Sequence, residues 1–239
     1  MTDEIVAGLE ALLTQFDALL GAGYSAVLYG AAARGEPVRD RSEVHVLLIL
    51  EQATPAQLRA LGPGFTAWGR AGFHAPLLLT RREWAHSGDA FPVEITDIKA
   101  AHRVLRGKDP VAEVTVAPGD LRAALERDLA SGLMRFRQAW AMHASEPAKL
   151  GEVARGAAGP MVALCRGVLA LAGRPVPASA DAVVREAAQV IGSAADALAA
   201  VVAAERRKGW KCPPETFEGF LAAVDAAARY VDGFPTGDR

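Results

Sequence analysis

The sequence predicts an α/β (α+β) N-terminal domain over residues 1–118, followed by an all-α antiparallel helical bundle over residues 119–239. Two observations predict this organisation. Helical and strand-like segments alternate in the first half, and only helical periodicity remains after Asp120. Alternation is typical of a small sheet covered by helices, whereas unbroken helical periodicity is typical of a bundle. We expect the boundary near Pro118 and Gly119.

Hydrophobic spacing defines the elements of the first half. Apolar residues recur at helical spacing over residues 3–20, and Gly21 and Gly23 end that helix. Two strand-like runs follow, Tyr24–Tyr29 and Glu43–Leu50, of which the second is nearly continuous in Val, Leu and Ile, as in strands buried on both faces. The other expected elements are a helix over 55–61, strands over 74–80 and 91–98, helical turns over 81–86, and a turn at 88–89.

The second half predicts helices only. Apolar residues repeat every three or four positions from Leu121 to Trp140, and Asp120 stands near the N-terminus of this helix, where the helix dipole favours a carboxylate. The remaining helices are expected over 160–171, 181–191, 193–206 and 217–231. These lengths fit an antiparallel bundle.

The composition excludes several classes of protein. The chain has 26 Lys and Arg against 28 Asp and Glu and a net charge of −2, so we expect no DNA partner. No apolar run approaches the ~18–20 residues that span a bilayer, and no secretory signal is recognisable, so we expect a cytoplasmic protein with no membrane partner. Two cysteines make no disulfide framework and no metal cluster. We expect Cys165 in the core and Cys212 at an exposed position.

The most informative stretch is Ala26–Leu50. An apolar strand stops at Gly30, an Ala-Arg-Gly triplet follows at 33–35, and residues 42–45 (Ser-Glu-Val-His) open a second apolar strand. This stretch resembles the nucleotidyltransferase (polymerase-β-like) superfamily, of the kanamycin-nucleotidyltransferase-like or minimal bacterial type. Its pattern is a strand, Gly-Ser, often Ala-Arg-Gly, and a strand that bears Asp-x-Asp. Residues 91–110 resemble the segment that carries a third carboxylate, and the helical half resembles the bundle that follows the catalytic domain.

The resemblance implies transfer of NMP from an NTP to an acceptor, assisted by Mg²⁺. Two carboxylates at i and i+2 on a strand share one face, and Mg²⁺ prefers anionic oxygen ligands. The corresponding catalytic positions are Glu43, His45 and Glu94, with Asp97 as the rival for the third, and Glu43 and Glu94 are the implied metal ligands. The implied phosphate turn consists of Gly30, Ala31 and Arg34.

Three of these positions depart from the family pattern. Ala31 replaces the serine, Glu43 is one methylene longer than Asp, and His45 removes a negative charge and an oxygen ligand. We therefore expect a nucleotidyltransferase-fold protein that is catalytically impaired or inactive and binds an NTP, another phosphorylated small molecule or a protein partner. The alternative is an active metal-dependent nucleotidyltransferase with an unknown acceptor. The resemblance also implies pairing into a homodimer.

Each of these residues also has a purely structural interpretation. Gly30 can end a strand with a positive φ, and His45 can be a hydrogen-bonded, half-buried histidine. Arg34 can form an ion pair with Glu36 or Asp40. The carboxylates can be solvated surface charges, namely Glu43, Glu94 and Asp97.

Overall fold

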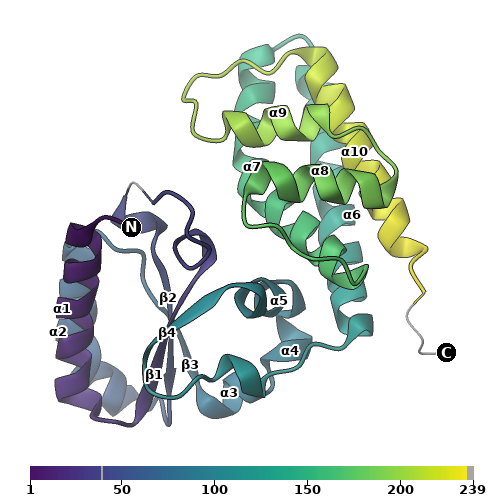
Figure 1. Cartoon of the computed structure of the whole chain (residues 1–239). Helices are drawn as coiled ribbons and strands as arrows, with labels where there is room; N and C mark the ends of the chain where they lie inside the picture. Colours follow the sequence, from purple (N-terminus) through teal and green to yellow (C-terminus); the bar gives the residue numbers. More distant parts are fainter. Residues whose placement is uncertain (39, 236–239) are drawn as a thin grey trace. The chain divides into compact units, whose positions relative to one another are not determined.

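The computed structural model describes residues 1–38 and 40–235, and the chain divides into two compact units (Figure 1). Unit 1 contains Met1–Ala90 and Asp97–Thr115, and unit 2 contains Phe91–Thr96 and the chain from Val116 onward. The fold is α+β, because unit 1 holds a four-stranded mixed sheet and the other regular elements are helices.

The sheet of unit 1 has the strand order β3-β2-β1-β4. β1 pairs antiparallel with both β2 and β4, and β2 pairs parallel with β3. Tyr29 of β1 is level with His45 of β2 and with His102 of β4, so these three residues mark one end of the sheet. The strands are β1 (Tyr24–Tyr29), β2 (His45–Leu50), β3 (Leu77–Thr80) and β4 (His102–Arg106).

Two long helices cover one face of this sheet (Figure 1). They are α1 (Asp3–Leu20) and α2 (Pro55–Arg70). Thr2 caps the N-terminus of α1 by accepting a hydrogen bond from the Ile5 N–H, and Gly21 at φ +57° ends the helix. The apolar stripe of α1, including Phe16, packs with strand residues such as Leu48 in one buried cluster.

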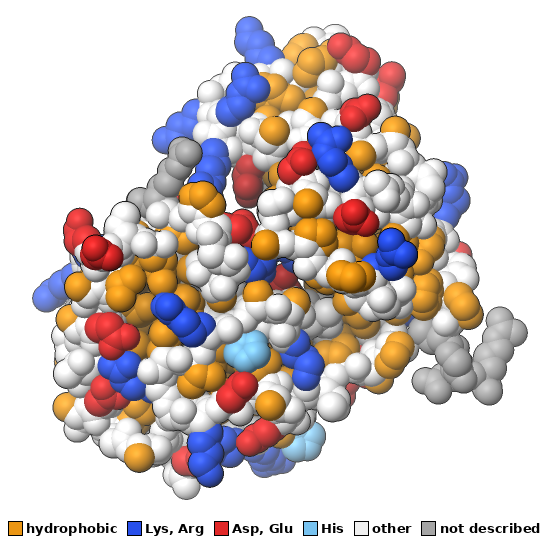
Figure 2. Space-filling view, viewed as in Figure 1, with side chains coloured by type: hydrophobic (Ala, Val, Ile, Leu, Met, Phe, Trp, Pro, Cys, Tyr) orange, Lys and Arg blue, Asp and Glu red, His pale blue; other side chains and the backbone are white. Residues whose placement is uncertain are grey.

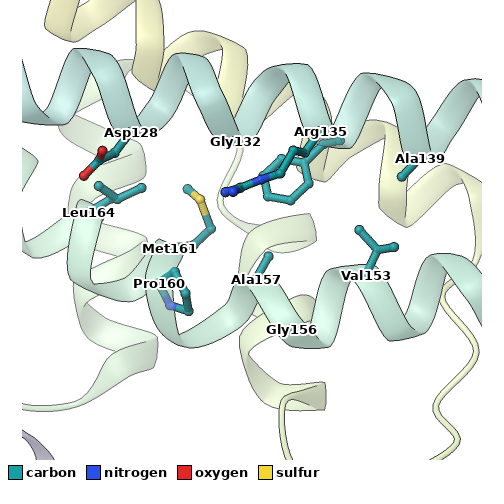
Figure 3. Close-up of a pocket in the computed structure, with 11 residues that line it drawn as sticks. Asp128, Gly132, Arg135, Ala139, Val153, Gly156, Ala157, Pro160, Met161 and Leu164 are labelled. Carbon is teal, nitrogen blue, oxygen red and sulfur yellow. The ribbon is translucent and has the colours of Figure 1, made fainter.

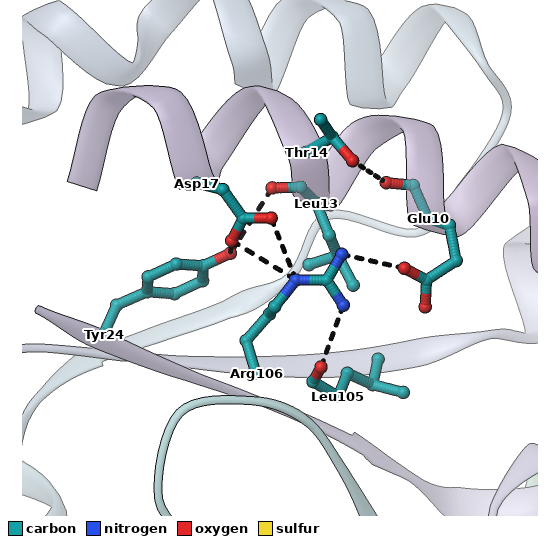
Figure 4. Close-up of polar contacts among 7 residues, drawn as sticks. All are labelled: Glu10, Leu13, Thr14, Asp17, Tyr24, Leu105 and Arg106. Carbon is teal, nitrogen blue, oxygen red and sulfur yellow. Dashed lines mark hydrogen bonds and ion pairs between the residues drawn. The ribbon is translucent and has the colours of Figure 1, made fainter. Parts of the chain in front are cut away.

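An ion-pair network ties α1 to β4 (Figure 4). Arg106 donates from Nε to Asp17 Oδ2 at 3.0 Å and from Nη2 to Glu10 Oε2 at 2.8 Å. The Tyr24 hydroxyl donates to Asp17 Oδ1 at 2.7 Å. Partial burial opposes ionisation of Asp17, but the hydrogen bonds from Tyr24 and Arg106 outweigh it and lower the pKa of that carboxyl.

The segment between β3 and β4 is helical. It contains α3 (Arg81–Ala85), α4 (Ser87–Ala90) and α5 (Pro92–Ala100). The expected strand over 91–98 and the turn at 88–89 were therefore wrong. Val93 of α5 is buried in unit 2 and Ile98 is buried in unit 1, so α5 has no single apolar stripe from which a helical period could be recognised.

The fourth strand, β4, was not predicted from the sequence. It is an edge strand, and three of its five side chains are histidine or arginine. β2 begins at His45, two residues later than expected, because Arg41–Glu43 form a 3-10 turn. The helix expected over 55–61 continues to Arg70, although Pro63 lies inside it.

Unit 2 is all-helical apart from its connecting loops. Its helices are α6 (Pro118–His143), α7 (Pro147–Leu171), α8 (Ala180–Ile191), α9 (Asp196–Ala204) and α10 (Pro214–Asp232). α6 packs against α7 and α10, and the five helices share one apolar core. α7 begins 13 positions before Pro160, where the sequence predicted its start, because this proline lies in the helix interior.

One helix, α7, is long and apolar enough to cross a membrane by length and composition alone. Of its most apolar window, 61% is buried inside the structure, and Leu150, Ala154 and Leu169 contribute to the core of unit 2. α7 thus has the burial of a core helix.

Figure 2 shows Lys and Arg scattered among Asp and Glu on the visible face.

Candidate functional site

The candidate site lies where β1 ends. Gly30 directly follows β1 and has φ +74°, a conformation that favours glycine, and the chain then enters the 3-10 turn Gly30–Ala32. A Cβ atom at Gly30 would lie 3.4 Å from Cδ2 of His45, so the turn and the first residue of β2 are in close contact. Two of the predicted residues, Gly30 and His45, are therefore brought together by the β1–β2 pairing.

His45 lies half-buried between two other rings. Its ring centroid is 5.6 Å from that of Tyr29 and 5.2 Å from that of His74, which meets it edge-on. Burial, together with the nearby His74 and Arg34, lowers the pKa of His45 below its usual 6.5, and Glu43 opposes this shift. His45 is therefore neutral at pH 7, with one ring nitrogen as a donor and the other as an acceptor.

His74 could not be recognised as a site residue from the sequence, because its spacing to other histidines suggests no site. Its position follows from topology: β3 runs parallel to β2, with Leu77 level with Leu47, so the residues before β3 lie near the start of β2. His74 Nδ1 is 2.9 Å from the carbonyl of Ala75, and a nitrogen this close to a carbonyl must carry the proton. In the neutral ring, Nε2 is then the acceptor.

Arg34 forms ion pairs with two carboxylates. Its Nε donates to Glu36 Oε1 at 2.7 Å, and its Nη1 donates to Asp97 Oδ2 at 3.1 Å. Only 9% of the Arg34 side chain is exposed. The structural interpretation of Arg34 is thus confirmed for Glu36 but not for Asp40, whose side chain accepts from the Ser42 N–H instead. Any anion at Arg34 would compete with the carboxylates of Glu36 and Asp97.

The predicted carboxylates occupy positions different from those expected. Glu43 belongs to the 3-10 turn before β2, so the alternation argument that placed Glu43 and His45 on one strand face was wrong. Glu94 is an exposed residue of the helix α5 and belongs to unit 2, whereas Glu43 belongs to unit 1. Asp97 is not on a strand either, and it pairs with Arg34.

The side chains around His45 do not fit a magnesium site. Mg²⁺ prefers several carboxylate oxygens in near-octahedral geometry, whereas the described neighbours of His45 are mainly rings and an arginine. Within residues 1–38 and 40–235, no group of three or more His, Cys, Asp or Glu side chains is arranged to hold a metal ion.

Both thiols are buried. Cys165 lies in the core of unit 2 as expected, whereas the expectation that Cys212 is exposed was wrong. Burial raises the pKa of Cys165 to about 12 and that of Cys212 to about 11. Since the thiolate is the reactive form, neither side chain is a nucleophile near neutral pH.

No protein-family model and no curated protein matches the sequence. The resemblance to nucleotidyltransferases therefore rests on the sequence pattern alone.

Proposed function

We propose that unit 1 is a nucleotidyltransferase-like binding unit, which holds a nucleotide or another phosphorylated small molecule and does not transfer nucleotidyl groups efficiently. The observation that carries this proposal is the contact between Gly30, in its left-handed conformation, and the neutral His45 on the paired strand. Such a turn brings backbone N–H groups close to a bound anion without a side chain in the way.

Each residue of the site has a distinct part in this proposal. The backbone around Gly30 and Ala31 and one ring N–H of His45 would donate to phosphate oxygens. Arg34, fixed by Glu36 and Asp97, would add a positive charge behind the turn without forming the main contact. The loss of transfer activity follows from Glu43 and His45, because together they replace two strand carboxylates by one carboxylate outside the strand and one neutral ring.

Calorimetric titration with ATP, GTP, CTP and UTP, each with and without Mg²⁺, tests this proposal. We expect saturable binding of at least one nucleotide that does not require Mg²⁺, and at least a tenfold loss of affinity in His45→Ala. His86→Ala is the matched control, because His86 is an exposed histidine of unit 1 beyond the end of α3. Absence of binding to all four nucleotides, or equal affinity of the two variants, contradicts the proposal.

The alternative, an active transferase, is tested separately with radiolabelled NTP, Mn²⁺ or Mg²⁺ and a panel of acceptors. Transfer of NMP that is abolished by Glu43→Ala would overturn the proposal that the site is impaired. Conversely, metal-dependent turnover that appears only in the double variant Ala31→Ser, His45→Asp would support it, since these substitutions restore the family pattern.

A further inference from the structure

Unit 2 contains a groove that the proposed function does not use. It has a volume of about 450 Å³ and lies between α6 and α7 (Figure 3). We call it the α6–α7 groove, and its defining residues are Gly132, Arg135 and Phe136 of α6 and Gly156, Pro160 and Met161 of α7. The volume falls within the range of small-molecule sites, and such sites often form between the helices of a bundle.

The groove exists because two facing helices carry small residues there. Gly132 of α6 and Gly156 of α7 have no side chain to fill the space between the helices. A Cβ atom at Gly156 would meet nothing within 4 Å, so this glycine is not required for close packing. A glycine in a helix interior costs about 1 kcal/mol relative to alanine. At Gly156 no close contact compensates this loss of stability, because the position faces open space.

Pro160 removes one backbone hydrogen bond from α7 beside the groove. A proline in a helix has no N–H, so the carbonyl four residues earlier loses its donor, and in α7 that carbonyl belongs to Gly156. Both residues line the groove, and a glycine can line it only with backbone atoms. All the side chains that α7 contributes to the groove are apolar.

Arg135 provides a positive charge. Figure 3 shows its guanidinium directed into the space between the two helices, toward Met161. Among the residues that the structure describes, none forms an ion pair or hydrogen bond with the Arg135 side chain. Two nearby arginines of α6 are paired, Arg137 with Asp225 at 3.0 Å and Arg127 with Asp128 at 3.4 Å.

From this combination we infer that the α6–α7 groove binds a small amphipathic carboxylate, such as a medium-chain fatty acid. The carboxylate pairs with Arg135, and its alkyl chain lies along apolar side chains such as Phe136 and Met161. Asp128, which also lines the groove, repels the carboxylate of the ligand. The charged end of the ligand therefore lies near Arg135 and the alkyl end lies near Asp128.

Calorimetric titration of the full chain with sodium decanoate tests the inference, with decanol as the neutral ligand of equal length. We expect one saturable site for decanoate and about tenfold weaker binding of decanoate in Arg135→Gln, with little change for decanol. Arg137→Gln is the matched control on the same helix, because its ion pair with Asp225 lies outside the groove. It should bind both ligands as the wild type does.

A second variant, Gly156→Leu, places a side chain in the open space and should abolish binding of both ligands, with folding checked by circular dichroism. Three results would overturn the inference: no saturable decanoate binding by the wild type, equal affinity for decanoate in Arg135→Gln and the wild type, or unchanged binding in folded Gly156→Leu. If Gly156→Leu does not fold, the comparison of Arg135→Gln with Arg137→Gln still decides.

Discussion

His45 illustrates how the surroundings of a strand end determine the charge of a side chain there. Tyr29, His74 and Arg34 surround its ring with partial burial and positive charge, and both effects favour the neutral form. A carboxylate at this position would instead be attracted by Arg34. The positive charge of Arg34 would therefore favour the ionised form of an aspartate at this position, which is the state that binds a cation, whereas partial burial would oppose it.

The lowered pKa of His45 predicts a pH dependence of stability. Below about pH 6.5 the unfolded chain takes up a proton at His45 that the folded chain does not, so the free energy of unfolding falls on acidification until the folded pKa is reached. His45→Gln removes this contribution. The Tm of the variant, measured by circular dichroism between about pH 5 and 8, should decline less than that of the wild type. His86→Gln should keep the wild-type slope, and equal slopes in all three proteins would contradict the prediction.

The buried ion pairs of Arg34 predict that this residue contributes more to the free energy of unfolding than a surface arginine does. Arg34→Met should lower the free energy of unfolding by about 2 kcal/mol, because its ion pairs with Glu36 and Asp97 are mostly shielded from water. Arg81→Met is the control, since the Arg81–Glu51 pair is more exposed and should contribute less than about 1 kcal/mol. Urea denaturation measures both, and similar losses in the two variants would show that Arg34 has no special structural part.

At the scale of elements, α7 contains two glycines with opposite requirements. A Cβ atom at Gly151 would overlap the carbonyl of Trp210, next to the point where the Cys212 N–H donates to the Pro147 carbonyl at 2.8 Å. Gly156 faces open space instead. The same residue type therefore permits a close backbone approach at one position and leaves a groove at the other.

These environments predict opposite effects for the same substitution. Gly151→Ala should destabilise the protein by about 2 kcal/mol, because a helix and the loop that contains Trp210 must separate. Gly156→Ala should stabilise it by up to about 1 kcal/mol, because alanine favours the helix and meets no obstacle. Urea denaturation of the pair provides the measurement. A shift of the same sign in both variants would refute the assignment.

The elements differ in how far the sequence could predict them. The helices α1 and α6 and the strand β1 were predicted closely, because each has one apolar face or a short apolar run between glycines. The helix α5 and the strand β4 were not. α5 has buried side chains on more than one side, and β4 is a charged edge strand, so neither has the period that identifies its type.

The candidate site was predictable only in part, because some of its contacts depend on features that a local sequence pattern does not define. Gly30 and His45 were brought together because pairing of consecutive strands follows from local sequence. The position of Glu43 depends on the residue at which β2 begins, and hydrophobic periodicity defines the start of a strand poorly. His74 depends on a parallel neighbour some thirty residues further along the chain, and nothing in the local pattern indicates such a pairing.

On the scale of the whole molecule, the division into units does not coincide with one cut in the chain. Phe91–Thr96 belong to unit 2, although Asp97–Thr115 belong to unit 1. Val93 is 6% exposed and is part of the apolar cluster that contains Leu121 and Leu125. The helical unit therefore depends on a residue that precedes the last strand of the sheet unit.

Val93→Ala should accordingly weaken unit 2 and leave the sheet intact. We expect a loss of about 2 kcal/mol, from removed apolar burial and the resulting cavity. Hydrogen exchange followed by mass spectrometry should show faster exchange in α6 and α7 and unchanged exchange in β1 and β2. Leu48→Ala, in the core of unit 1, should give the reverse pattern. Faster exchange of both units in Val93→Ala would contradict this assignment.

The interleaved chain also has a consequence for synthesis on the ribosome, where domains generally fold in the order in which they emerge. Unit 1 is complete once Thr115 has left the exit tunnel. At that moment Phe91–Thr96 have already emerged, but none of the five bundle helices has left the tunnel. The apolar side chain of Val93 therefore remains exposed to solvent, or bound to a chaperone, until α6 and α7 have left the tunnel.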